Sequence, residues 1–434
     1  MKTRTWHLVQ ISTLGLAGLL ALLVGIARVP ALEALLPKSY FQTALVGHVD
    51  LFLVVWYVII PVLFLKNKNL IPEKSECLTF GLMGLGTLGI VISSVFALGQ
   101  PVMANYVPFI VNPIFVGGFF AFMGGIAVAT TEARRNTNKL SPLIKNSISS
   151  ATLCYLGTTL SLIFIGVKIV FEGEALFSHQ SLTRLFWFTG HILQFAHVSF
   201  MLLIWAEFLS DLGVSEKELT PLHKLIQQLP IGVFLGLLTV FFRTSEELLT
   251  TKLLTDLKSY GIGIPTAIAA AYTLWIMFSA KLRGPGQFRL ATLISALALL
   301  ILGGVIAIAA NMQVQTTLIP AHYHAVLTAV GVTFMGYTYA LLEKEKIQLP
   351  SPRFATLQPY LYGFGTFALA AGMAWAGLHN APRKTPGISY IQSGDINLIL
   401  SLYMWGAGVI LSVLGGFAYL INVGLSCLRW REKK

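Results

Sequence analysis

Charged residues are scarce in this sequence, and their scarcity excludes a soluble protein of ordinary composition. Only 11% of the 434 residues are Asp, Glu, Lys or Arg, whereas 55% are hydrophobic and the mean hydropathy is +0.74. Soluble domains carry about 25% charged residues, so a lipid bilayer is the expected solvent. Runs of about 20 mostly apolar residues, the length that crosses the hydrocarbon core, recur along the whole chain.

Cysteine is also scarce, and this excludes two kinds of site. The sequence has three cysteines, Cys77, Cys154 and Cys427. Each lies in or at the end of an apolar run, and no two of them form a CxxC pattern. Neither a disulfide framework nor a thiolate metal site is therefore expected.

The sequence does contain a regular series of apolar spans. We expect an all-α membrane protein with twelve transmembrane helices, forming a single domain over residues 1–434. The predicted spans are 8–27, 43–65, 77–99, 108–129, 148–171, 184–209, 224–243, 259–280, 288–311, 317–342, 359–378 and 397–426. The first span lacks a small-residue cleavage site, so we expect a retained helix and not a signal peptide.

Basic residues are distributed unevenly between the two sides of these spans. The termini and the loops after even-numbered spans hold 21 of the 30 Lys and Arg residues, and the other side holds nine. Because cytoplasmic loops carry the excess of positive charge, both termini are expected in the cytoplasm, in a multi-pass protein of a bacterial inner membrane. Anionic membrane lipid is the expected partner of this charge, and no nucleic-acid partner is expected.

Five of the nine histidines are expected at one depth in the outer half of the membrane. His48, His191, His322 and His324 lie early in spans that enter from the outer face, and His379 ends a span at that face. Histidine is costly inside a membrane, and imidazole is a common ligand of haem iron. One such residue is equally well explained by a hydrogen bond between helices, but the convergence of several favours a haem or metal site.

His322 and His324 form the most informative pair. Residues two apart on an α-helix point about 200° away from each other. These two imidazoles therefore cannot bind one metal from one face, but they can serve two sites on opposite sides of the helix. If His324 pairs with His48, the product is a six-coordinate low-spin haem; His322 then offers a ligand to a second haem, whose open side His191 could face.

Four stretches carry a resemblance to a known family. They are Gly47–Asp50 with Ile60-Pro61 in the second span, Leu185–His191 in the sixth, Ala321–Leu327 with Met335-Gly336 in the tenth, and Ala381–Lys384 after the eleventh. They resemble four motifs of subunit I of the haem-copper oxidases. In the same order, these motifs contain the haem ligand of helix two, the first copper-binding histidine, the two haem ligands of helix ten, and the basic pair that binds the haem propionates. This family includes cytochrome c oxidase and the large subunit of nitric oxide reductase.

The resemblance implies a twelve-helix subunit I-like bundle with cytoplasmic termini and two haems. His48 and His324 would ligate the low-spin haem, and His322 would be the proximal ligand of the high-spin haem. The resemblance further implies a cytochrome-type electron donor or a partner subunit, and a small gas ligand, O2 or NO. The basic pair that would bind the haem propionates is Arg383 and Lys384.

Part of the family's copper site is missing from the sequence. The adjacent histidines expected near the end of the seventh span are replaced by Phe241-Phe242, and Phe195 stands where relatives have tyrosine or glutamate. One imidazole, His191, would hold copper weakly. His197, six residues further, would need a distorted helix to share the ion. Copper or non-haem iron near His191 is therefore left open.

Other polar residues also lie within the spans or at their ends. Asp50 and Gln194 are candidates for orienting a haem ligand or relaying a proton. Glu207 is expected to reach the interface, and Lys168 to extend its ammonium group outward to water.

Three functions follow from these patterns. The first is a redox enzyme that reduces O2 or NO at the high-spin haem, with His322 and His191 at the reaction site and electrons arriving through the low-spin haem. The second is a non-catalytic haem protein for electron transfer, gas sensing or assembly. The third is a secondary transporter, because twelve spans are also a common transporter plan. The retained haem ligands favour the first.

Overall fold

The computed structural model describes residues 3–26, 38–104, 106–242, 247–280, 282, 286–310, 316–382 and 392–429. Twelve helices in this part of the chain are long and apolar enough to cross a membrane, so the predicted all-α class and the number of spans are confirmed. The chain divides into two compact units, which are considered separately below. The first unit is Met1–Val24, Leu36–Ala206 and Glu216–Thr266, and the second is Gly25–Leu35, Glu207–Ser215 and Ala267–Lys434. A single domain over the whole chain stays a prediction.

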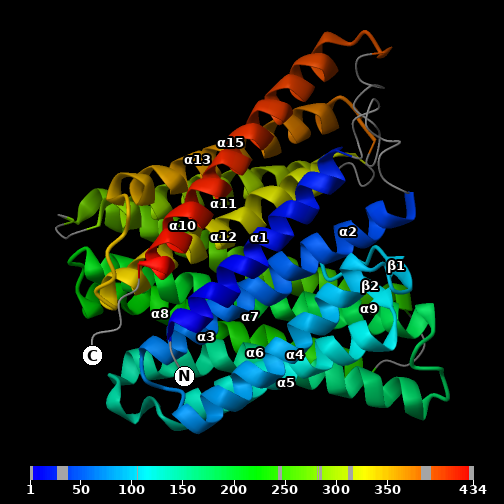
Figure 1. Cartoon of the computed structure of the whole chain (residues 1–434), viewed down its shortest axis with the longest axis horizontal. Coiled ribbons are helices and arrows are strands. Elements are labelled where there is room, and N and C mark those ends of the chain that lie inside the picture. Colours follow the sequence, from blue (N-terminus) through cyan, green and yellow to red (C-terminus); the bar gives the residue numbers. More distant parts are fainter. Residues whose placement is uncertain are drawn as a thin grey trace. The chain divides into compact units, whose positions relative to one another are not determined.

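The first unit is built from helices that follow one another along the chain (Figure 1). Its helices are α1 (Thr3–Ile26), α2 (Lys38–Asp50), α3 (Tyr57–Asn67), α4 (Glu73–Val95), α5 (Pro113–Arg135), α6 (Pro142–Phe171), most of α7 (His179–Asp211), α8 (Glu216–Phe242) and α9 (Glu247–Lys258). Helices α4 and α5 approach each other closely because glycines face each other between them. A Cβ atom on Gly86 would lie 2.5 Å from the carbonyl oxygen of Gly118. Small residues allow such close approach of membrane helices.

Two of the spans contain a π-helical segment that the hydrophobic pattern did not predict. In the second span, η2 (Leu51–Trp56) lies between α2 and α3, directly after Asp50. In the eighth span, η4 (Ser259–Gly263) lies between α9 and α10 (Ile264–Ser279). Such segments occur mostly at functional sites, and η2 begins three residues after His48.

A short antiparallel hairpin precedes α5. Strand β1 (Gln100–Val102) pairs with β2 (Phe109–Val111), with Gln100 opposite Val111. Residues 108–112 were expected to begin the fourth span, and that boundary is wrong, because α5 begins only at Pro113. The side chain of Asn112 caps this helix by accepting a hydrogen bond from the backbone N–H of Ile114 at 2.7 Å, and proline is favoured at the first helical position.

A buried polar network ties α1, α3 and α4 together. The ammonium group of Lys66 lies 2.6 Å from Oε1 of Glu76, and the indole N–H of Trp6 donates to the same oxygen at 2.9 Å. A short distance along α1, Gln10 accepts a hydrogen bond from the indole of Trp56 at 2.9 Å. Lys66 is half-buried and the other four side chains are buried, so each bond replaces water that the interior lacks.

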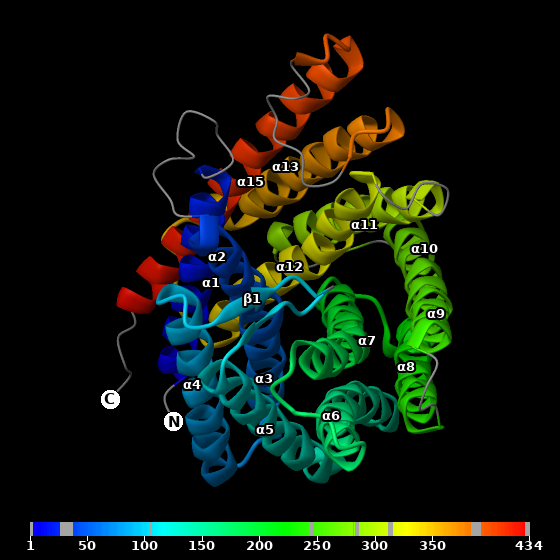
Figure 2. The same ribbon diagram turned by 90° about the vertical axis from the view of Figure 1, so that its right-hand side faces the viewer.

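The second unit contains α10, α11 (Gln287–Ala310), α12 (Leu318–Lys344), α13 (Pro352–Leu378) and α15 (Ile396–Leu428). Helix α12 packs against both α11 and α13, and α13 packs along α15 (Figure 2). Glycines again set the closest distances: a Cβ atom on Gly408 would lie 2.2 Å from the backbone nitrogen of Leu369, and one on Gly372 would lie 2.6 Å from that of Trp405.

Candidate functional site

His48 is held by a hydrogen bond that fixes its tautomer. Its Nδ1 atom lies 2.9 Å from the carbonyl oxygen of Ala17, on α1. Because a carbonyl oxygen can only accept, Nδ1 must carry the proton, and in a neutral imidazole the lone pair then lies on Nε2. The Phe52 ring stacks beside the imidazole, with the ring centroids 6.4 Å apart.

His322 and His324 have the same tautomer but different carbonyl partners. Nδ1 of His322 donates to the carbonyl oxygen of Gly303 on α11, at 2.8 Å. Nδ1 of His324 donates to the carbonyl oxygen of Pro320, one turn earlier on its own helix, at 2.7 Å. A metal-ligating histidine almost always donates its other ring N–H in this way, and in a neutral imidazole of this tautomer the lone pair lies on Nε2.

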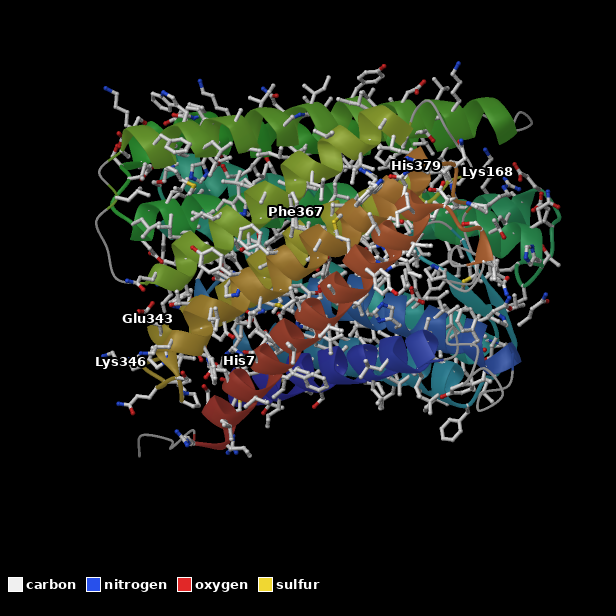
Figure 3. The ribbon with its side chains drawn as sticks, turned by 90° about the horizontal axis from the view of Figure 1, so that it is seen from above. His7, Lys168, Glu343, Lys346, Phe367 and His379 are labelled. Atoms are coloured by element: carbon white, nitrogen blue, oxygen red, sulfur yellow. The ribbon has the colours of Figure 1, made fainter. Side chains whose placement is uncertain are left out.

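The start of α12 and the end of α13 lie at the same end of the second unit. The backbone N–H of Thr317 donates to the carbonyl oxygen of Ala381 at 3.0 Å, and Thr316 and Pro382 form a β-bridge. His379, labelled in Figure 3, follows the last turn of α13 and donates from Nδ1 to the carbonyl oxygen of Trp375 at 3.0 Å. The structure thus brings His379 to the end of the unit that carries the tenth-span histidines. The predicted propionate ligands Arg383 and Lys384 lie outside the described residues.

His191 is buried in the first unit beside a tryptophan. Its side chain is 5% exposed, Nδ1 donates to the carbonyl oxygen of Trp187 at 2.6 Å, and the two ring centroids are 4.1 Å apart. His191 therefore has the tautomer that leaves the lone pair on Nε2, as in the other three candidates.

The described residues do not supply a copper site. No group of three or more His, Cys, Asp or Glu side chains in the described part of the chain is placed to hold a metal ion. Phe195 lies against Gly232 of α8 and Gly261 of η4; a Cβ atom on Gly232 would lie 2.3 Å from the Phe195 ring. Phe241 is 54% exposed, and the Phe242 side chain lies outside the described residues. One imidazole without further donors does not fit copper.

His197 is surrounded by aromatic side chains. Its Nδ1 lies 2.7 Å from the hydroxyl of Tyr106, and the rings of Tyr57 and Tyr155 lie 5.1 and 6.1 Å from its own ring. The imidazole is 1% exposed. These contacts favour a packing role for His197 over metal binding. Sequence reasoning missed Tyr106, because nothing in its loop indicates a contact with a residue 91 positions away.

The other intramembrane polar residues have specific surroundings. Asp50 is fully buried, and neither of its carboxylate oxygens has a hydrogen-bond partner within the described ranges. Glu207 forms an ion pair with Lys344 at the end of α12. The Lys168 ammonium group, labelled in Figure 3, donates to the carbonyl oxygen of Val240 on α8 at 2.9 Å and lies 4.0 Å from the Glu172 carboxylate; its extension to water stays a prediction.

The fold and the histidine pattern define a polytopic membrane protein of the oxidase subunit I class. Residues 3–418 match the family described as Cytochrome C and Quinol oxidase polypeptide I, and the chain belongs to this family. The resemblance predicted from the four sequence motifs is confirmed.

Two relatives and one solved structure are similar to this chain. An uncharacterized protein of Aquifex aeolicus (strain VF5) is 30% identical over 351 residues, covering 78% of this chain and 84% of the relative. An uncharacterized protein of Rickettsia prowazekii (strain Madrid E) is 23% identical over 496 residues, covering 96% and 94%. A heme-copper terminal oxidase dimer solved by cryo-EM has the same fold, with a TM-score of 0.78, 17% identity and coverage of 100% of this chain and 86% of the oxidase chain.

Proposed function

We propose that this chain is a haem-binding membrane redox protein that passes electrons from a low-spin to a high-spin haem for the reduction of O2 or NO. The observation that carries the proposal is the shared tautomer of the candidate ligands. His48, His322 and His324 each donate from Nδ1 to a backbone carbonyl oxygen. Metal-ligating imidazoles almost always donate their other ring N–H in this way, so these residues fit the group.

Each histidine has a distinct proposed role. His48 and His324 would hold the low-spin haem, and His322 would hold the high-spin haem. When bound, haem iron supplies one-electron transfer and a coordination position for a small gas. The carbonyl partners keep the rings oriented and raise the basicity of Nε2. Arg383 and Lys384 are proposed to pair with the propionates, as hydrated cations suited to carboxylates.

His191 is the proposed protein group nearest the reacting gas. Its buried ring packs on Trp187 and donates from Nδ1, so in the neutral form Nε2 presents a lone pair and not a proton. It therefore suits accepting a hydrogen bond or holding a ligand in place. Copper is not part of the proposal, because the described donor set does not fit it.

Among the described residues no group of three or more donors could hold copper, and this favours a second candidate, a haem protein without turnover that transfers electrons, senses a gas or serves assembly. Phe195 is the specific observation, since its ring fills the space between α7, α8 and η4 and carries no polar group. Both candidates place the chain in a bacterial inner membrane with cytoplasmic termini, in contact with a cytochrome-type donor or partner subunit.

The test is a reduced-minus-oxidised spectrum of the purified chain, together with metal analysis and carbon monoxide binding. Two haems per chain without stoichiometric copper are expected. His324→Ala should remove the low-spin band and leave the carbon monoxide-binding species, whereas His179→Ala, at an exposed histidine, should change neither. A colourless protein from haem-replete cells would refute haem binding and leave a solute carrier as the better explanation. Reduction of O2 or NO by the purified protein would support the redox enzyme, and haem binding without this reduction would support the second candidate.

A further inference from the structure

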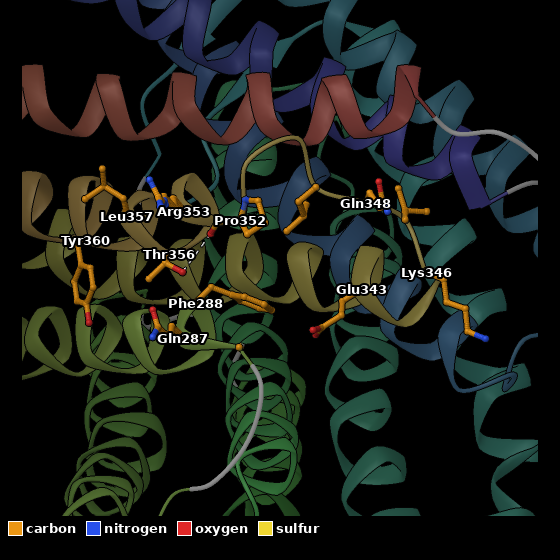
Figure 4. A pocket seen from close by; sticks show the side chains of 13 residues that line it. Gln287, Phe288, Glu343, Lys346, Gln348, Pro352, Arg353, Thr356, Leu357 and Tyr360 are labelled. Atoms are coloured by element: carbon orange, nitrogen blue, oxygen red, sulfur yellow. Dashed lines mark hydrogen bonds between the residues drawn. The ribbon is translucent and has the colours of Figure 1, made fainter.

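The open groove of the second unit offers no single point at which a charged ligand would bind. It has a volume of about 1020 Å³ and lies between the start of α11, the end of α12 and the start of α13 (Figure 4). Lys346 and Arg353 lie at its opposite ends and point apart, and Glu343 pairs with Arg289 at 2.6 Å. A more specific arrangement of reactive groups lies in the first unit.

Tyr106 and His197 form a hydrogen-bonded pair of a phenol and an imidazole. The Tyr106 hydroxyl lies 2.7 Å from Nδ1 of His197, and His197 is 1% exposed. Tyr106 belongs to the loop between β1 and β2, and its ring lies beside α7: a Cβ atom on Gly190 would lie 3.4 Å from Cδ1 of Tyr106. The loop therefore places a phenol against a buried imidazole of a transmembrane helix.

Tyr106 occupies this position in a strained backbone conformation. Its φ angle is +76°, which residues other than glycine seldom adopt. Such conformations cluster at functional sites and persist only where the surrounding structure determines them. The contact with α7 and the bond to His197 are the surroundings that hold Tyr106 in place.

The proton of this hydrogen bond belongs to the phenol. Nε2 of His197 has no hydrogen-bond partner within the described ranges, whichever ring nitrogen carries the proton. If Nδ1 donated to the phenol oxygen, the Tyr106 O–H would be left without an acceptor as well. Donation from the O–H to Nδ1 leaves fewer groups unpaired and is favoured. The lone pair of a basic nitrogen therefore faces the phenol proton.

A series of aromatic rings leads from His197 toward His48. The Tyr57 ring lies 5.1 Å from that of His197, and the Phe52 ring lies 4.9 Å from that of Tyr57 and 6.4 Å from that of His48. The Trp56 ring lies 5.4 Å from Phe52 and 5.6 Å from Tyr57. A turn closed by i→i+5 hydrogen bonds contains more residues than an α-helical turn, so η2 places both Trp56 and Tyr57 one turn after Phe52. Phenol and indole rings are among the side chains most readily oxidised by one electron.

We propose that Tyr106 is a redox-active tyrosine that gives one electron to a haem oxidised by peroxide and gives its phenol proton to His197. The Tyr106 O–H bond breaks, an N–H bond forms at Nδ1 of His197, and the electron passes along Tyr57 and Phe52 toward the iron proposed at His48. The products are a neutral phenoxyl radical, an imidazolium and an iron reduced by one electron. Peroxide is the co-reactant, and it is reduced to water as it oxidises the haem.

The hydrogen bond makes this step possible because a base within hydrogen-bond reach takes the proton as the electron leaves. An electron from the donor, with return of the same proton from Nδ1, restores Tyr106. The pair would thus remove oxidising equivalents that peroxide leaves on the haem. This inference rests on the proposed function, since its oxidant forms at a haem.

The test is freeze-quench EPR of the purified full chain mixed with hydrogen peroxide, with haem bands recorded on the same samples. Ring-deuterated tyrosine identifies the radical. Tyr106→Phe removes the proposed donor, and His197→Gln keeps an acceptor but no basic nitrogen. The matched control is Tyr155→Phe, which removes another buried phenol, 6.1 Å from His197 between ring centroids, whose hydroxyl has no hydrogen-bond partner in the described part of the chain.

Wild type and Tyr155→Phe should give a tyrosyl signal that narrows with deuterated tyrosine. Tyr106→Phe should lose this signal, and His197→Gln should weaken it. Phe52→Leu interrupts the ring series without removing either partner of the hydrogen bond, and should slow the appearance of the signal; an unchanged rate would contradict the route through Phe52.

The same tyrosyl signal in Tyr106→Phe, or haem bands without any tyrosyl signal in wild type, would overturn this inference alone. A wild type without haem bands would overturn the proposed function as well. If Tyr106→Phe does not fold, the wild-type radical still decides. A phenoxyl radical bonded to an imidazolium couples to a proton that exchanges in D2O, so a signal unchanged by D2O would contradict the pair.

Discussion

Nδ1 of His322 donates to the carbonyl oxygen of Gly303 across 2.8 Å between α12 and α11. The two helices come this close because residue 303 has no side chain: a Cβ atom there would lie 2.5 Å from Cγ1 of Val326 and 3.3 Å from Cβ of Ala325. The orientation of the proposed high-spin ligand therefore depends on a glycine on the neighbouring helix.

Gly303→Ala should accordingly disturb the proposed high-spin haem. The added methyl group pushes α11 away from α12, which lengthens the hydrogen bond that orients His322. The expected result is a shifted or reduced carbon monoxide-binding spectrum with the low-spin band retained. Gly304→Ala is the matched control, since a Cβ atom at 304 meets nothing within 4 Å. Identical spectra in both variants would show that this bond does not orient a haem ligand.

Loss of the Lys66 ammonium group should strongly destabilise the first unit. In Lys66→Met the buried Glu76 carboxylate loses the ammonium group that lies 2.6 Å from Oε1 and keeps the hydrogen bond from the Trp6 N–H. Breaking a buried pair by removing one partner costs about 3–5 kcal/mol. Arg135→Gln removes an ion pair with Glu132 whose arginine side chain is 70% exposed, and should cost about 0–1 kcal/mol. Unfolding of the detergent-solubilised variants measures both changes in the free energy of unfolding. Similar losses in the two variants would contradict the importance of burial.

Tyr106 should make the stability of the first unit depend on alkaline pH. Burial raises the pKa of this loop tyrosine above its ordinary value of 10.0. The folded protein therefore keeps the phenol proton where the unfolded chain releases it, so the stabilisation is complete below about pH 10 and is lost as the pH rises through the folded-state pKa.

Tyr106→Phe tests this dependence and the bond to His197 together. The variant should lose about 1–3 kcal/mol at neutral pH, because Nδ1 of the buried His197 loses its partner, and its stability should fall less steeply between pH 10 and 11 than that of wild type. Tyr403→Phe, at a tyrosine that is 69% exposed, is the control. A wild-type pH profile for Tyr106→Phe would mean that the phenol ionises equally in both states.

The features that the sequence predicted are those encoded by local composition. Twelve spans follow from apolar length alone, whereas the common depth of the histidines stays a prediction. The π-helical segment η2 was missed because Leu51–Trp56 is an ordinary apolar run. The fourth span was begun too early at 108, although Asn112 followed by Pro113 is a typical helix start. The carbonyl partners of His48 and His322 come from other helices and are invisible in sequence.

The contact between Phe195 and Gly232 should be measurable as a coupling energy. A methyl group at 232 would overlap a buried ring, so Gly232→Ala should cost about 1–3 kcal/mol. Phe195→Leu shortens the side chain, and in that background the same methyl group should cost at least about 1 kcal/mol less. Gly263→Ala is the control, since a Cβ atom there meets nothing within 4 Å. Thermal unfolding of the single and double variants gives the coupling. Strictly additive losses of stability would show that the Phe195 ring does not contact Gly232. The ring would then not fill the position at which relatives carry tyrosine or glutamate.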